Sequence, residues 1–114
     1  MDLGCLTSFT KTYFFFGKEK TMYSTMTNWE FTAMTDEMIH TIKTVYFPRM
    51  KSQGAIDVYN IKTSETTGTV VTIWPDKDTA DKAMEEAHSV RSDAAAKFDS
   101  KVVSMASGPV VAKG

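Results

Sequence analysis

Apolar and polar residues alternate along MYSTMTNWEF, residues 22–31, with the two-residue period of a β-strand. The alternation divides the strand into one face with Tyr23, Thr25, Thr27, Trp29 and Phe31 and another with Met22, Ser24, Met26, Asn28 and Glu30. Both faces carry apolar side chains, so we expect both to be partly covered.

A helical period follows this strand. Thr35 is a candidate N-cap, and Asp36 and Glu37 stand in the first turn, where the helix dipole favours negative charge. One stripe at helical spacing contains Met38, Ile42, Val45, Tyr46 and Arg49. Pro48 lies inside this run and predicts a kink or an end of the regular helix, and Gly54 is a stop signal beyond it.

Two further strands are predicted over residues 55–63 and 69–74, with a turn, SETTG, that ends at Gly68. The short connection favours an antiparallel hairpin. A second helix is then predicted, with Asp78 as its cap and Asp81 as the acid of a capping box. Its buried stripe would comprise Ala80, Ala83, Ala87, Val90, Ala94 and Phe98. The last strand, KVVSMASGPVV, would end near Gly108 and Pro109.

The order strand, helix, strand, strand, helix, strand predicts an α+β protein with the ferredoxin-like βαββαβ arrangement. This arrangement has a four-stranded antiparallel sheet with both helices on one face. The other face would stay partly apolar. Two copies can hide it by placing their sheets face to face, which gives a dimeric α/β barrel.

The 114 residues are long enough for one domain, which we assign to residues 21–114. Residues 1–20 are predicted to be an N-terminal extension, packed on the domain or on a partner because its four phenylalanines would be an aggregation hazard if exposed. An upstream start codon, with Met22 as the original start, is an alternative interpretation.

Charge and cysteine usage narrow the class of protein. Thirteen basic and 14 acidic residues give a net charge of −1, without the basic patch that nucleic-acid binding needs. Cys5 is alone, so neither an intramolecular disulfide nor a cysteine-based metal cluster is expected. No apolar run approaches the roughly 18 residues of a membrane helix. We therefore expect a cytoplasmic protein without a metal site and without nucleic-acid or membrane partners.

Two segments carry a resemblance to a known family. TVVTIWPDKDTADKA resembles the third strand and helix start of the dimeric α/β barrel superfamily, particularly proteins similar to antibiotic-biosynthesis monooxygenases, and MTNWEFTAMTDEM resembles the first strand and its entry into helix one. The resemblance implies a homodimer with a ligand cavity between sheet and helices. Some members are oxygenases that need no cofactor, and we expect none here.

A haem-degrading branch of that superfamily uses an Asn in the first strand, a Trp at the end of the third and a His on the second helix. The matching positions here are Asn28, Trp74 and His88. His88 lies about one turn beyond the family position, so haem ligation by His88 is not expected.

The same three residues have ordinary structural interpretations. Trp74 would lie at the cavity rim or in the core, and Asn28 would orient a ligand carbonyl or satisfy a backbone group. His88 falls on the flank of its helix, at the cavity mouth or facing water. No paired carboxylates, phosphate loop or nucleophile elbow occur, so no catalytic residue is assigned.

The chain contains eight methionines, which fill irregular apolar space adaptably. Met26, Met38 and Met84 are candidate ligand contacts, and Tyr46 is a candidate polar tip. These features favour a homodimer that binds a small apolar or amphipathic molecule, such as a lipid fragment or aromatic metabolite. A cofactor-independent monooxygenase-like enzyme for an aromatic or polyketide-like substrate, and a dimer without any ligand, are the alternatives.

Overall fold

The computed structural model describes residues 21–114, so the predicted N-terminal extension lies outside the described residues. Strand β2 (Tyr23–Phe31) leads into helix α2 (Asp36–Thr41), a π-helical turn η2 (Ile42–Tyr46) and helix α3 (Phe47–Ser52). Strands β3 (Asp57–Lys62) and β4 (Thr67–Trp74) follow, then helices α4 (Lys77–Lys82) and α5 (Met84–Lys97) and strand β5 (Ser100–Pro109). No helix within residues 21–114 combines the length and the apolar character needed to cross a membrane.

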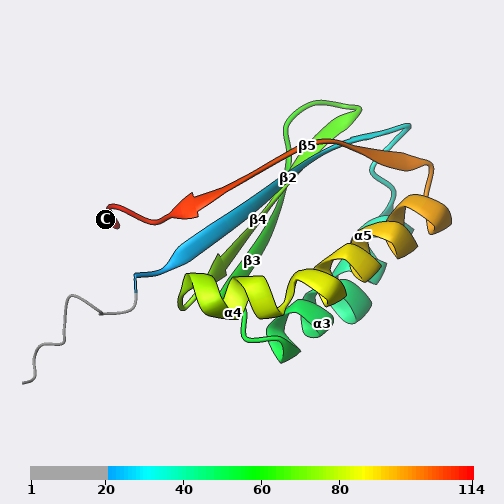
Figure 1. The fold of residues 1–114 in the computed structure, drawn as a ribbon. Coiled ribbons are helices and arrows are strands. Elements are labelled where there is room, and N and C mark those ends of the chain that lie inside the picture. Colours follow the sequence, from blue (N-terminus) through cyan, green and yellow to red (C-terminus); the bar gives the residue numbers. More distant parts are fainter. Residues whose placement is uncertain (1–20) are drawn as a thin grey trace, which may run out of the picture.

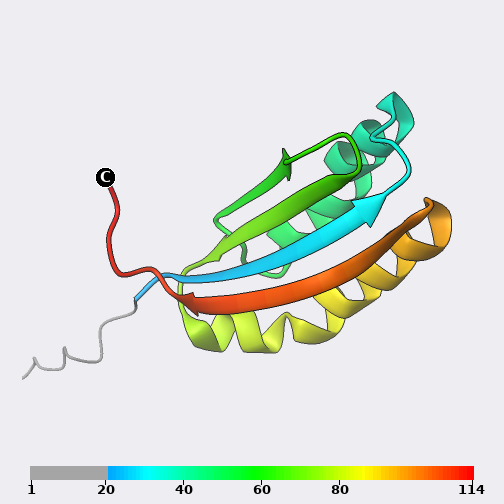
Figure 2. The same ribbon diagram turned by 90° about the horizontal axis from the view of Figure 1, so that it is seen from above.

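The four strands form one antiparallel sheet in the order β3-β4-β2-β5. The helices of residues 21–114 lie on one face of this sheet, and no part of these residues covers the opposite face (Figures 1 and 2). The predicted βαββαβ fold is therefore confirmed. We call the helix-covered face of the sheet the inner face and the other the outer face.

Helix α2 begins as predicted, because the Thr35 hydroxyl accepts a hydrogen bond from the Met38 backbone N–H at 3.1 Å. The regular helix then opens into the π turn, where the Phe47 N–H reaches the Ile42 carbonyl, five residues back. Pro48 lacks an N–H and its ring crowds the carbonyl four residues before it, which accounts for the interruption just ahead of it. The π turn shifts the helical phase, so Val45, predicted in the buried stripe, is 43% exposed.

The second helical region follows its predicted stripe but not its predicted cap. Asp76, not Asp78, is the N-cap, and its carboxylate accepts from the Thr79 N–H and hydroxyl, both at 2.8 Å. Asp81 forms an exposed ion pair with Lys77 at 2.8 Å instead of closing a capping box. Asp76 takes the cap position because its backbone is extended, one residue after Pro75 and two after the end of β4.

Gly68 belongs to β4 and not to the preceding turn, which is a second correction. A Cβ at this position would lie 3.1 Å from the Phe31 ring and 3.1 Å from the Ile61 carbonyl oxygen. The glycine therefore lets the Phe31 ring lie directly against the sheet. Gly54 does end α3 as predicted, with a φ of +105°.

Candidate functional site

A cavity of about 110 Å³ lies between the inner face of the sheet and the helices. The sheet lines it with Thr25, Thr27, Trp29, Phe31, Val58, Asn60, Gly68, Val70, Thr72 and Ser100. The helical layer and its connections line it with Met34, Met38, Ile42, Tyr46, Phe47, Met50, Ala87, Val90, Arg91, Ala94 and Phe98.

The β2 face that lines the cavity is one of the two faces separated by the sequence alternation. Thr25, Thr27, Trp29 and Phe31 all point inward, and their partners across β4 follow the same face. Asn28 and Met26 consequently point to the outer face, because successive strand residues alternate. Their expected place in the cavity is therefore wrong. The strand period defines two faces but does not say which one the helices cover.

Asn28 is held within a polar row across three strands of the outer face. Its side-chain amide donates to the Ser104 hydroxyl at 2.9 Å, and its amide oxygen accepts from the Thr69 hydroxyl at 2.7 Å. These side chains from β5 and β4 bind both ends of the amide. Asn28 thus stabilises the sheet and does not reach the cavity.

Trp74 is a core residue rather than a rim residue. It is 1% exposed, and its indole N–H donates to the Thr25 hydroxyl at 3.0 Å. Around it cluster Met50, Ala55, Ala80, Ala83 and Ala87. The small alanines leave room for the indole, which explains why β4 ends on the largest side chain just before an alanine-rich helix. Trp74 follows the cavity-lining Thr72 on the inner face, so it fills the space next to the cavity.

His88 and Met84 do not line the cavity either. His88 is exposed on α5, and Met84 is 57% exposed near the start of the same helix. Of the seven predicted ligand-binding residues, the structure brings only Met38 and Tyr46 into the cavity lining. Met38 lies on α2 and Tyr46 is the last residue of the π turn, and both belong to the predicted stripe.

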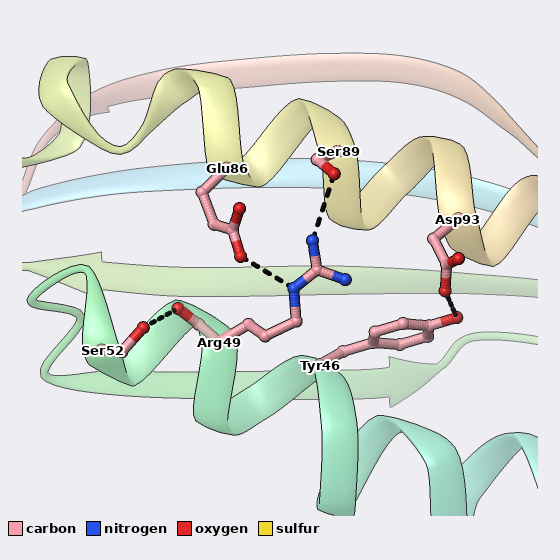
Figure 3. A network of polar contacts seen from close by, with 6 residues as sticks. All are labelled: Tyr46, Arg49, Ser52, Glu86, Ser89 and Asp93. Atoms are coloured by element: carbon pink, nitrogen blue, oxygen red, sulfur yellow. Dashed lines mark hydrogen bonds and ion pairs between the residues drawn. The ribbon is translucent and has the colours of Figure 1, made fainter.

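Tyr46 is 5% exposed, and its hydroxyl donates to the Asp93 carboxylate at 2.7 Å (Figure 3). Burial, followed by the hydrogen bond to Asp93 and the negative charge of Asp93, together raise the pKa of Tyr46 to about 12, against a smaller opposing effect of Arg49. The phenol is therefore neutral at physiological pH. Its ring contributes an apolar wall to the cavity while its hydroxyl joins two helices.

A second contact joins the same helices. The Arg49 guanidinium on α3 contacts the Glu86 carboxylate at 2.7 Å and donates to the Ser89 hydroxyl at 3.1 Å, both on α5 (Figure 3). The hydrogen bond from Arg49 to Glu86 holds the pKa of Glu86 below its ordinary value. Arg49 and Tyr46 together fix the spacing of the two helices that cover the cavity.

Arg91 and Asn60 are lining residues that sequence reasoning missed. Arg91 is half-buried on α5, and within residues 21–114 no lining residue other than Arg91 carries a charge at neutral pH. A usable signal was present: the positions three and four residues away are Ala87, His88, Ala94 and Ala95, so no acid along the helix can pair with it.

A more open hollow of about 390 Å³ lies at the end of the sheet where β2 meets β5. Its lining includes Glu30, Asp99 and Lys101, with Glu30 and Lys101 paired at 3.6 Å. Asp99 accepts a hydrogen bond from the Thr32 hydroxyl. Residues 21–114 contain no group of three His, Cys, Asp or Glu side chains arranged to hold a metal ion.

Comparisons with known proteins support the fold alone. No family model matches the chain, and no curated protein sequence matches it. A similar solved structure is a dimeric ferredoxin-like protein from an uncultured marine organism. It shares 15% sequence identity and a TM-score of 0.55, and the alignment covers 83% of this chain and 92% of that one. The chain has a ferredoxin-like α+β fold.

Proposed function

We propose that the protein binds a small apolar or amphipathic molecule in the cavity between the sheet and the helices. The observation that carries the proposal is the lining itself, in which aromatic, aliphatic and methionine side chains surround a few hydroxyl and amide groups. Ligand sites are typically mostly apolar with a few placed polar groups.

The cavity volume limits the size of the ligand. At about 110 Å³ it is smaller than the roughly 300–1,000 Å³ of sites for drug-sized molecules. An engineered apolar cavity of about 150 Å³ binds benzene. A single aromatic ring or a short aliphatic chain therefore matches the space. Met34, Met38 and Met50 can adjust to either shape because their side chains are unbranched and flexible.

The outer face supports a homodimer as part of the proposal. Met26, Tyr59 and Ile61 on this face are 38%, 53% and 47% exposed. They form an apolar surface of the kind that marks protein interfaces, and the similar marine protein is dimeric. We expect two copies to pack outer face to outer face, with the Asn28 amide already satisfied inside the interface.

The dimer is tested by sedimentation equilibrium. We expect wild type to be dimeric and Met26→Glu to be monomeric, because a charge would be buried in the interface. Val45→Glu, on a residue of the helical layer that is 43% exposed, should remain dimeric. A monomeric wild type at all concentrations would contradict the dimer.

The binding proposal is tested by organic extraction of the purified protein with mass spectrometry, followed by titration with benzyl alcohol and hexanol. Trp29 fluorescence reports occupancy because this residue lines the cavity. Ala94→Leu adds three carbons inside the cavity and should abolish the response. Ala96→Leu adds them on the exposed face of the same helix and should not. Equal responses in both variants would contradict cavity binding.

The oxygenase alternative gains no specific support from the cavity. Its two matching residues, Asn28 and Trp74, both lie outside the lining. Binding without an assigned reaction is therefore the function that we propose.

A further inference from the structure

The charge pattern of the cavity identifies the chemical class of its ligand more narrowly than its size does. Among the described residues, 21–114, the lining contains one cationic side chain, Arg91, and no aspartate or glutamate. A guanidinium stays protonated at neutral pH and has five N–H donors but no acceptor. A mostly apolar and otherwise uncharged cavity therefore has one positively charged position.

The two acids nearest to Arg91 along the chain, Glu86 and Asp93, are engaged by other groups. Glu86 pairs with Arg49 at 2.7 Å, and Asp93 accepts from Tyr46 at 2.7 Å. No hydrogen bond or ion pair joins Arg91 to any side chain within residues 21–114.

The helical geometry of α5 explains this separation. At 100° per residue, Arg91 and Asp93 lie about 200° apart around the helix. Asp93 and Glu86 face α3 and its π turn, as Figure 3 shows for their contacts. Arg91 belongs to the opposite flank, beside the cavity-lining Ala87 and Ala94. The surrounding protein lowers the pKa of Arg91 by desolvation, without an opposing anionic partner.

We propose that Arg91 binds the carboxylate of a small amphipathic monocarboxylic acid whose apolar part occupies the cavity. Arg presents its donors in a planar fork that matches a carboxylate, and such charge-assisted bonds are about twice as strong as neutral ones. The apolar part would contact the Trp29 and Phe31 rings and the Met38 side chain, which line the cavity. This inference rests on the proposed binding function.

The test compares matched ligands on the full chain. Benzoate is titrated against benzyl alcohol, and hexanoate against hexanol, with Trp29 fluorescence and ligand-observed NMR as readouts. We expect each acid to bind at least about tenfold more tightly than its alcohol at low salt. Benzoate and hexanoate also distinguish an aromatic from an aliphatic acid as the preferred ligand.

Two variants assign the preference to Arg91. Arg91→Gln should remove the preference, so that acid and alcohol bind this variant with similar affinity. Lys97→Gln removes the same charge from an exposed position of α5 and should keep the preference. Circular dichroism and thermal unfolding confirm that both variants are folded.

The outcomes separate this inference from the proposed function. Equal binding of acids and alcohols, or an acid preference that survives Arg91→Gln, would overturn the carboxylate inference and leave cavity binding in place. Absence of binding by all four compounds, together with an empty extract, would overturn both.

Discussion

At one end of the space between sheet and helices, Trp74 packs against Ala80, Ala83 and Ala87 and is 1% exposed. Beyond it, between Thr72 and Phe31, larger side chains surround a cavity of about 110 Å³. Both regions lie between the same two layers. At the first, one large side chain meets alanines and the space is filled. At the second, flexible and aromatic side chains border a space that none of them fills.

The largest expected effect comes from emptying the packed end. Trp74→Ala should lower the free energy of unfolding by about 3–5 kcal/mol, because it leaves a void among residues too small to collapse into it. Urea denaturation measures the loss. Trp29→Ala, which removes the same side chain from the cavity wall, should cost roughly half as much or less. Equal losses would show that the two ends are packed alike.

Adding side-chain volume should also distinguish the packed end around Trp74 from the cavity. Ala83→Leu should cost about 1–3 kcal/mol, since Ala83 is 1% exposed and lies in the Trp74 cluster. Ala94→Leu should change stability by less than about 1 kcal/mol, because the cavity accepts the added carbons. Urea denaturation of both variants checks the difference. A larger cost at Ala94 than at Ala83 would contradict it.

The smallest expected effect concerns the contact that spaces the helices over the cavity. Tyr46→Phe should cost about 1 kcal/mol below pH 10, by loss of the hydrogen bond to Asp93. The raised pKa means that the folded state holds its phenolic proton more tightly than the unfolded state, whose value is 10.0. This contribution is complete below pH 10 and is lost as pH rises through about 12.

The two stability curves should therefore converge between pH 10 and pH 12, as urea denaturation at a series of pH values would show. Other tyrosines and lysines titrate in both proteins, so their effects cancel in the difference. A gap between wild type and Tyr46→Phe that stays constant up to pH 12 would show that the phenol is not shielded as the structure indicates.

Local rules were sufficient where one residue acts on its immediate neighbours along the chain. The Thr35 cap, the Gly54 stop and the alanine stripe of the second helical region were all predicted correctly. The same rules missed the cap at Asp76, since two aspartates stand two positions apart and the end of β4 decides between them. They also missed the exposure of Val45, because the π turn rotates part of the predicted stripe outward.

The candidate site depended on information that local rules do not contain. The resemblance assigned Asn28, Trp74 and His88 to one predicted site. In the structure, Asn28 lies on the outer face, Trp74 in the core and His88 on the exposed side of α5. Arg91 was missed because a lone arginine on a helix is ordinarily a surface residue. Its significance depends on an apolar wall contributed by strands distant in sequence.

The sequence by itself determined the order of strands and helices and the two alternative faces of each strand, because backbone periodicity and capping act over a few residues. Only the tertiary structure decided which strand face is covered, that Trp74 fills one end of the interlayer space, and that Arg91 borders a mostly apolar, otherwise uncharged cavity. These features depend on how side-chain volumes and charges from the sheet and the helices pack against each other. The hydrophobic period of a single segment contains no information about such contacts between distant segments.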